Sequence, residues 1–190
     1  MNKIPTLFLR NPENMKFVTM EVNPDAAWIF GVDVMPTVKK DGTNIRVTIK
    51  AQKCMLVEKR RNPTREEKAN GAEPGYVQAH RYDPQDKHIF AAVDNTDFLG
   101  WPDGVWPCEA LGPKIQGGTE SDTPQLYPFS WNAEWIDEEI PLTYDAIKSF
   151  LETHHIEGIV WHEQSNIGRM AKIKRRDFGL QWPLKKETNK

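Results

Sequence analysis

The sequence reads VDVMPTVKKDGTNIRVTIKA over residues 32–51. From Thr43 to Ala51 apolar β-branched residues alternate with polar ones, which predicts a half-buried strand. Residues 32–38 also read as an extended segment, in which Pro36 favours an edge strand or a bulge. Between the two segments lies Asp-Gly, a dipeptide typical of tight turns. We therefore expect a hairpin whose turn occupies residues 40–43.

Outside this stretch the chain alternates between short strands and one clear helix. Thr143 can cap a helix, and the spacing of apolar residues after it predicts a helix over Tyr144–Thr153. The polar segment from Pro63 to Thr96 predicts loops and a short helix. Apolar runs predict four further strands, at Cys54–Lys59, Val105–Leu111, Gly158–His162 and Met170–Lys174. The fold class is therefore α+β, with mostly antiparallel strands and few helices.

The composition limits what kind of protein this is. The chain has 190 residues, of which 38% are hydrophobic and 27% charged, as is typical of a folded domain. The net charge of −2 excludes a protein that binds nucleic acid through its bulk positive charge. From residue 169 to the end, however, eight basic residues stand against two acidic ones. We expect one domain over residues 1–190 with a basic tail over residues 175–190.

Several classes of protein are not expected from the sequence. No run approaches the roughly 20 apolar residues of a membrane-spanning helix, and the first residues lack the apolar core of a secretory signal. Cys54 and Cys108 lie far apart, without partners at metal-ligand spacing. We therefore expect a cytoplasmic monomer that is not associated with a membrane.

The pattern Lys-x-Asp-Gly, at Lys39 to Gly42, has two readings. In one, it is a surface turn with solvated lysines. In the other, Lys39 is a nucleophile that the tight turn directs into a cleft.

Four later segments favour the second reading. The segment KRRN (59–62) ends a predicted strand, and Glu109 lies inside an apolar run, where an unpaired carboxylate would be costly. Glu157 stands at the entrance of the next predicted strand, and the pleat sends Lys172 and Lys174 to one face of the last.

In this order the motifs resemble those of the covalent nucleotidyltransferases, a superfamily that contains ATP-dependent DNA ligases, RNA ligases and mRNA capping enzymes. The segments EALGPKIQGG (109–118), EGIVW (157–161) and KIKRRDFG (172–179) are most similar to the RNA ligase branch. The resemblance spans about residues 34–182. It implies a nucleotidyltransferase domain, similar to the ATP-grasp fold, of mostly antiparallel sheets flanked by helices. Since 16 residues follow Lys174, we do not expect the OB-fold domain that many relatives carry.

The resemblance also implies the chemistry. Lys39 would attack the α-phosphate of ATP and expel pyrophosphate, which leaves a lysyl-AMP intermediate. We expect Arg61, Lys172 and Lys174 to favour the neutral, nucleophilic form of Lys39 and to stabilise charge on the phosphates. Arg60 stays open as an alternative to Arg61.

The remaining site residues would bind the nucleotide and its metal ion. By the same resemblance Glu109 would accept hydrogen bonds from the ribose, and Phe129 would stack on the adenine. The backbone at Thr37 and Val38 would contact the adenine edge. Glu157 would hold Mg²⁺, or Mn²⁺ in its place, because hard cations prefer carboxylate and phosphate oxygens.

The predicted function is therefore an ATP-dependent RNA ligase. AMP would pass from Lys39 to a 5′-phosphate, and a 3′-hydroxyl would then displace it and seal the strand. The alternatives are a GTP-using capping guanylyltransferase, a DNA ligase, and an RNA-binding module that has lost the chemistry. Phosphate contacts are expected from basic residues near the end of the chain, namely Arg175, Arg176, Lys185 and Lys186.

Overall fold

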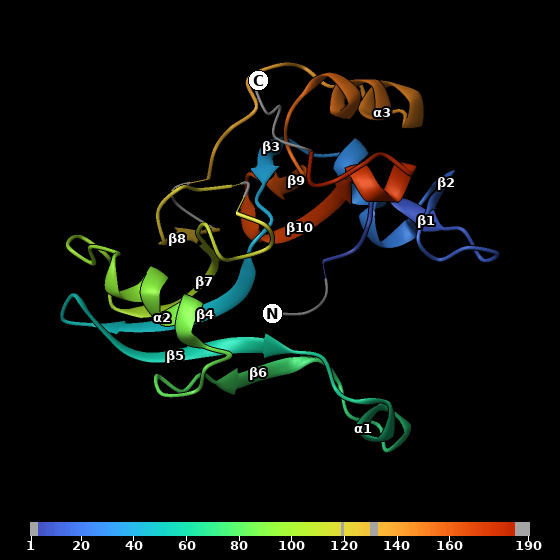
Figure 1. The fold of residues 1–190 in the computed structure, drawn as a ribbon. Helices are drawn as coiled ribbons and strands as arrows, with labels where there is room; N and C mark the ends of the chain where they lie inside the picture. Colours follow the sequence, from blue (N-terminus) through green and yellow to red (C-terminus); the bar gives the residue numbers. More distant parts are fainter. Residues whose placement is uncertain (1–3, 119, 130–132, 185–190) are drawn as a thin grey trace, which may run out of the picture. The chain divides into compact units, whose positions relative to one another are not determined.

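The chain folds into two compact units, drawn in Figure 1 from a computed structural model that describes residues 4–118, 120–129 and 133–184. Residues 41–132 make up most of the first unit, which we call the central unit. Residues 2–40 and 133–190 make up the second, the terminal unit. Each has its own sheet and its own hydrophobic core.

The terminal unit is built on a three-stranded antiparallel sheet. Its strand order is β10 (Asn166–Lys174), β9 (Gly158–Glu163) and β3 (Val34–Lys39). The other elements of this unit are the hairpin of β1 (Phe8–Arg10) and β2 (Val18–Val22), helix α3 (Tyr144–Thr153) and the 3₁₀ helices η1 (Pro24–Phe30) and η2 (Arg175–Phe178).

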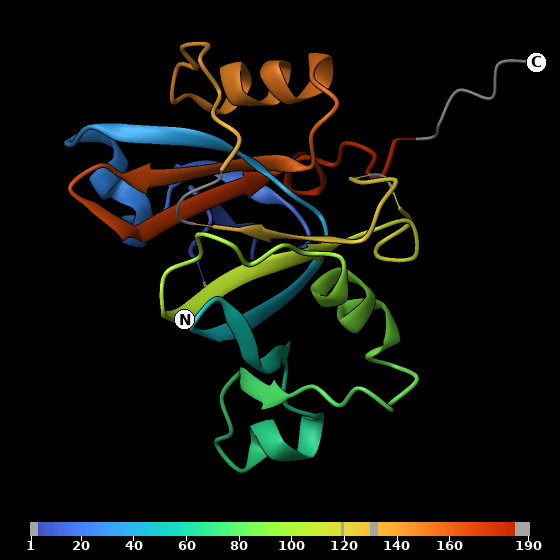
Figure 2. The same cartoon turned by 90° about the vertical axis from the view of Figure 1, so that its left-hand side faces the viewer.

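Helix α3 covers one face of this sheet, as Figure 2 shows. The hydroxyl of Thr143 caps the helix by accepting a hydrogen bond from the N–H of Ala146 at 3.3 Å. Spacing of three and four residues puts Ile147, Phe150 and Leu151 on one side of the helix. They pack into the core with residues from alternate positions of the strands, among them Ile159, Trp161, Ala171 and Ile173.

The central unit is built on a five-stranded antiparallel sheet. Its order is β6 (Gly75–Gln78), β5 (Lys53–Arg61), β4 (Thr43–Lys50), β7 (Gly104–Leu111) and β8 (Gln125–Pro128). Helix α2 (Lys87–Asp94) buries Ile89, Ala92 and Val93 in the core beneath the sheet, whereas helix α1 (Arg65–Ala69) has no buried residue. The alternation in β4 supplies that core with Ile45, Val47 and Ile49.

The α+β prediction is confirmed, since the sheets are mostly antiparallel and the helices are few. The hairpin expected at residues 40–43 is wrong, because β3 pairs with β9, whereas β4 pairs with β5 and β7. The Asp-Gly turn lets the chain leave one sheet and enter another. The segment from Pro63 to Thr96 holds two helices and strand β6 rather than one short helix. Among the described residues no helix is long and apolar enough to cross a membrane.

Candidate active site

Strand pairing in the terminal unit places three predicted lysines on one face of its sheet. Gly158 of β9 lies between Lys39 of β3 and Lys174 of β10. One step along the same face, Val160 lies between Thr37 and Lys172. Directly paired residues of a sheet point to the same side. We call this side, formed by Thr37, Lys39, Lys172 and Lys174 together with Glu157, the lysine face.

The opposite face of the same strands fixes this arrangement. Val38, Ile159 and Ile173 occupy adjacent positions across the three strands, and all three side chains are buried. A slip of one residue in any strand would expose these apolar groups and bury the lysines. The hydrophobic core therefore determines which lysines share a face.

Glu157, immediately before β9, is the carboxylate of the lysine face. It is 4% exposed, and its Oε2 accepts a hydrogen bond from Nζ of Lys39 in a buried ion pair. Its Oε1 lies 4.0 Å from Nζ of Lys174. Lys39 also donates to the carbonyl oxygen of Lys40 at 3.1 Å. These contacts hold the amine of Lys39 at the end of β3.

The strongest perturbation on this face falls on Lys172. Burial, followed by the neighbouring charges of Lys39 and Lys174, lowers the pKa of its ammonium from 10.5 to about 8, against the opposing effect of Glu157 and Asp177. Three cations against one carboxylate leave the face with a surplus of positive charge, which suits an anionic ligand.

Replacing Lys172 with methionine is expected to stabilise the protein near neutral pH. Because the folded-state pKa is lowered, the unfolded chain binds a proton that the native side chain lacks between pH 8 and 10.5, and wild-type stability rises across that interval. The free energy of unfolding of Lys172→Met should exceed that of wild type by about 3 kcal/mol at neutral pH. Urea unfolding of both proteins at several pH values measures the difference, which should close toward pH 10.5; a constant difference would contradict the assignment.

Gly158 has a steric reason to be glycine. A Cβ at this position would lie 2.1 Å from the carbonyl oxygen of Ile173 and 2.9 Å from Cα of Lys174. The Glu-Gly pair thus combines a carboxylate that reaches the lysine face with a residue that allows β9 and β10 to approach.

Thr37 and Val38 have their polar groups engaged within the terminal unit. The hydroxyl of Thr37 donates to the carbonyl of Val160 at 3.1 Å and lies 3.2 Å from Nε2 of His162. The N–H of Val38 donates to the carbonyl of Glu134 at 2.8 Å. A contact of the Val38 N–H with an adenine edge would therefore have to replace this bond.

In the central unit, Glu109 of β7 is 8% exposed, and its Oε1 accepts a hydrogen bond from the N–H of Gly42 at 3.2 Å. The approach is close, because a Cβ on Gly42 would lie 2.6 Å from Cγ of Glu109 and 2.4 Å from the carbonyl oxygen of Ala110. Because Gly42 has no side chain, the Glu109 side chain can pack against the turn at this position.

Arg61, the arginine selected from the sequence, does not lie on the Glu109 face of the central sheet. Strand pairing puts Asn44 beside Glu109, and the hydroxyl of Tyr76 donates to Oδ1 of Asn44 at 2.7 Å. Arg60 pairs with Tyr76 across β5 and β6 and so shares this face. Arg61 is the next residue of β5, so its side chain points to the opposite face of the sheet.

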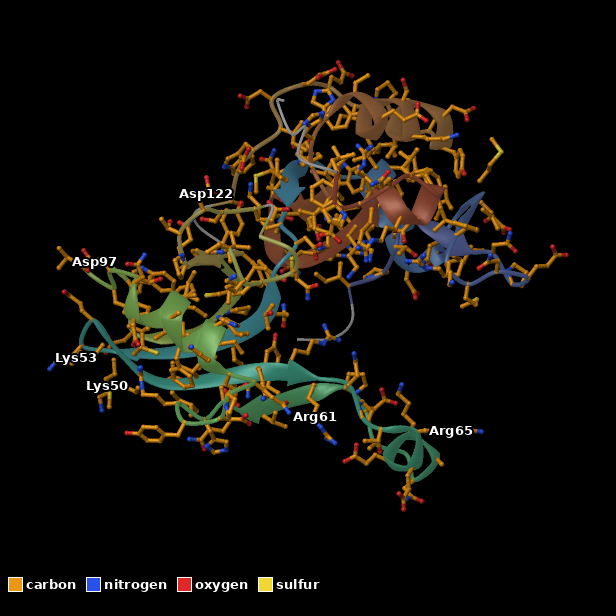
Figure 3. All side chains as sticks on the ribbon, in the orientation of Figure 1. Lys50, Lys53, Arg61, Arg65, Asp97 and Asp122 are labelled. Atoms are coloured by element: carbon orange, nitrogen blue, oxygen red, sulfur yellow. The ribbon has the colours of Figure 1, made fainter. Side chains whose placement is uncertain are left out.

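The surroundings of Arg61 are those of a surface residue. Its guanidinium pairs with Glu67 of α1 at 2.5 Å, and both side chains are well exposed. Figure 3 shows Arg61 at the α1 end of β5, with Lys50 and Lys53 at the other end of the β4–β5 hairpin. Arg60, the alternative that the sequence left open, is the arginine on the same face of the sheet as Glu109.

Phe129 follows β8 and is half-buried. Its N–H donates to the carbonyl of Pro107 at 3.2 Å. This bond extends the pairing of β7 with β8, in which Glu109 lies opposite Tyr127, and Phe129 is two residues after Tyr127 on the same side of the sheet. The structure therefore places Phe129 on the face that carries Glu109. Glu109 and Phe129 belong to the central unit, whereas the lysine face belongs to the terminal unit.

Two further expectations concerned the basic end of the chain. Arg175 is 5% exposed, and its guanidinium donates to the carbonyls of Leu151, His154 and Gln181. The predicted phosphate contact is therefore wrong for Arg175, which joins η2 to α3. Arg176 is exposed, and residues 185–190, including Lys185 and Lys186, lie outside the described residues.

The metal prediction concerns a single carboxylate. Within the described residues no group of three or more His, Cys, Asp or Glu side chains could hold a metal ion. Magnesium in nucleotide sites is commonly bound by one or two carboxylates and completed by phosphate oxygens and water. The buried Glu157 carboxylate fits such a site, in which the nucleotide would supply the other ligands.

Sequence reasoning missed several polar residues of both faces. Asn44, Tyr76 and Tyr127 lie on the Glu109 face, and His162 lies beneath Thr37. Asn44 and His162 could have been found from the sequence, because both lie on strands that were predicted. Side chains two or four residues apart on a strand share a face, which places Asn44 with Gly42 and His162 with Gly158. Tyr76 and Tyr127 lie on β6 and β8, which were not predicted, so for them no such signal existed.

Comparison with known proteins gives a limited result. The sequence matches no protein-family profile, and no curated protein is significantly similar to it. Among solved structures, an apo mutant of an RNA ligase from Naegleria gruberi is similar at a TM-score of 0.46 with 13% sequence identity. The match covers 90% of this chain and 58% of that one, so the chain corresponds to little more than half the length of that ligase.

Proposed function

We propose that this protein is an ATP-dependent RNA ligase that works through a covalent lysyl-AMP intermediate on Lys39. The observation that carries the proposal is the lysine face. There one amine at a strand end is hydrogen-bonded to a buried carboxylate and lies on the same side of the sheet as two further lysines. Lys and Glu side chains are rarely buried unless they are paired, and clusters of perturbed ionisable groups are found preferentially at functional sites.

In the first step the neutral amine of Lys39 attacks the α-phosphorus of ATP. An N–P bond forms, the bond to the bridging oxygen breaks, and pyrophosphate leaves with the electron pair. The ammonium of Lys39 first loses one proton to Glu157, its hydrogen-bond partner, and the resulting amine releases a second proton to solvent or to the departing pyrophosphate as the N–P bond forms. Lys172 and Lys174 would stabilise the charge on the phosphates.

The other predicted residues would hold the nucleotide. Glu109 would accept hydrogen bonds from the ribose hydroxyls and Phe129 would stack on the base, with Arg60 in place of Arg61 as the arginine of the site. When bound at Glu157, Mg²⁺ supplies charge neutralisation for the phosphate oxygens. In the two later steps AMP passes to a 5′-phosphate of RNA, and a 3′-hydroxyl displaces it.

The first test is adduct formation by the wild-type protein. The protein is incubated with Mg²⁺ and either α-labelled ATP or α-labelled GTP, and then analysed by denaturing gel and by intact mass. Fragmentation mass spectrometry then locates the modified residue. We expect an AMP adduct on Lys39. A folded protein, not already adenylylated, that forms no adduct with either nucleotide would overturn the proposal.

The same experiment separates the ligase from the other candidates. An adduct of GMP rather than AMP would favour the capping guanylyltransferase. With AMP established, sealing of nicked or single-stranded RNA and DNA substrates of one sequence would distinguish an RNA ligase from a DNA ligase. Binding of RNA without any adduct would favour the inactive module.

A further inference from the structure

A basic groove of about 660 Å³ lies in the terminal unit beside the lysine face. One wall comes from the β1–β2 hairpin and contributes Arg10, Met15, Lys16 and Phe17. The other comes from the end of β10 and from η2, with Lys174 and Arg176. The volume falls within the range of roughly 300 to 1,000 Å³ that is usual for ligand sites.

The charge of the groove is suited to a polyanion. Its one acidic residue, Asp177, is 2% exposed and is bound on both oxygens, by the guanidinium of Arg10 at 2.7 Å and by the N–H of Lys174 at 2.9 Å. Lys16 is exposed on one wall, and Arg176, whose guanidinium also donates to the carbonyl of Trp182 at 2.9 and 3.1 Å, is exposed on the other. Among the described residues that line the groove Asp177 is the only acidic one, so phosphates can be contacted by cations of both walls.

The groove also presents an aromatic ring. Phe17 is 38% exposed and Met15 is 65% exposed, although large apolar side chains normally avoid water. Gly179, with φ +78°, lies against the Phe17 ring, since a Cβ there would be 3.5 Å from the ring edge. An exposed ring among cations is the combination that binds single strands, because bases stack on the ring while the cations contact the backbone.

The loop that carries this ring is held by its own sequence. In the segment NPENMKF (11–17), the side chain of Asn11 accepts a hydrogen bond from the N–H of Glu13 at 2.9 Å, and that of Asn14 from the N–H of Lys16 at 3.2 Å. The N–H of Asn11 in turn donates to the carbonyl of Phe17 at 3.0 Å. The groove wall is thus preorganised, which lowers the entropy cost of binding.

We propose that this groove binds a single-stranded segment of the polynucleotide substrate next to its reacting end. Lys174 joins the two sites, since it lines the groove and also lies 4.0 Å from Glu157 on the lysine face. A strand in the groove therefore has a phosphate position adjacent to Lys39 and its partners. This inference rests on the proposed function, of which it names the substrate-binding surface.

The test is fluorescence anisotropy of a labelled single-stranded RNA, and of a DNA of the same sequence, with the full chain. Phe17→Ala should weaken binding by about 5- to 100-fold through loss of stacking, and Phe30→Ala, at another exposed phenylalanine, should not. Lys16→Gln should reduce the slope of log affinity against log salt by about 0.7, whereas Lys53→Gln should leave it unchanged. Polyphosphate, which has no bases, should compete equally well in wild type and Phe17→Ala. Equal RNA affinity and salt slope in wild type and the groove variants would overturn the proposal.

Self-adenylylation without RNA separates this inference from the proposed function. Phe17→Ala and Lys16→Gln should form the AMP adduct as wild type does, because neither side chain belongs to the lysine face. If the adduct forms and neither variant changes strand binding, only the groove proposal is refuted. If the wild-type protein forms no adduct but the groove variants bind the strand more weakly, the ligase proposal is refuted and the groove proposal stands. Stronger binding of RNA or DNA identifies which strand the groove prefers.

Discussion

Replacing Lys39 with alanine is expected to lower adduct formation with ATP by at least about a thousandfold, since the substitution removes the amine that we propose as the nucleophile. Lys40→Ala is the matched control. Lys40 is adjacent in sequence, but its ammonium pairs with Glu134 at 2.5 Å. This variant should form the adduct within a few-fold of wild type. Intact mass after incubation with ATP and Mg²⁺ measures both.

A second variant separates the nucleophile from its charge. Lys39→Arg keeps a cation beside Glu157, yet a guanidinium stays protonated and should form no adduct. Both Lys39 variants should still seal a strand that already carries AMP on its 5′-phosphate, because that step does not use the amine. Adduct formation by Lys39→Ala at the wild-type rate would place the nucleophile elsewhere.

Gly158→Ala is expected to cause the largest loss of stability among the single substitutions considered. The added methyl group would meet the backbone of Ile173 and Lys174, so β9 and β10 would have to separate at the position that aligns Lys39 with Lys174. We expect a loss of about 2 to 3 kcal/mol in the free energy of unfolding, with a melting temperature lower by about 5 to 10 °C. Thermal unfolding followed by circular dichroism measures it.

Gly168→Ala is the control for this experiment. Gly168 lies on β10 as well, but a Cβ there would have only the side-chain oxygen of Asn166 nearby, at 3.5 Å. Its stability should stay within about 0.5 kcal/mol of wild type. Should both variants unfold at the wild-type temperature, the close pairing of β9 with β10 at Gly158 would be wrong. Adduct formation should fall in Gly158→Ala even at temperatures where it is folded.

Those parts of the fold that have a clear local pattern could be predicted from the sequence. The cap at Thr143 and the apolar spacing after it defined α3 to the residue, and the alternation along β4 located that strand. The common face of Lys172 and Lys174 also followed from the period of a strand. These features depend on neighbours in sequence, which is why local reasoning reached them.

Features that depend on distant pairing could not be reached in this way. An Asp-Gly turn has the same sequence whether the next strand returns to its neighbour or enters another sheet, so the hairpin at residues 40–43 was wrong. The choice between Arg60 and Arg61 needed the pairing of β5 with β6, a strand whose four residues give no periodic signal. The buried role of Arg175 depends on three carbonyls, two of them from the region of α3.

The ion pair of Lys39 with Glu157 bears on how readily reactive metabolites can modify the Lys39 amine. Acyl phosphates and thioesters acylate lysines only through the neutral amine. A buried carboxylate and a backbone carbonyl both accept hydrogen bonds from Nζ of Lys39, so the amine is already engaged when such electrophiles reach it. For Lys39, the nucleophile we propose, these contacts would limit chance modification before a nucleotide binds.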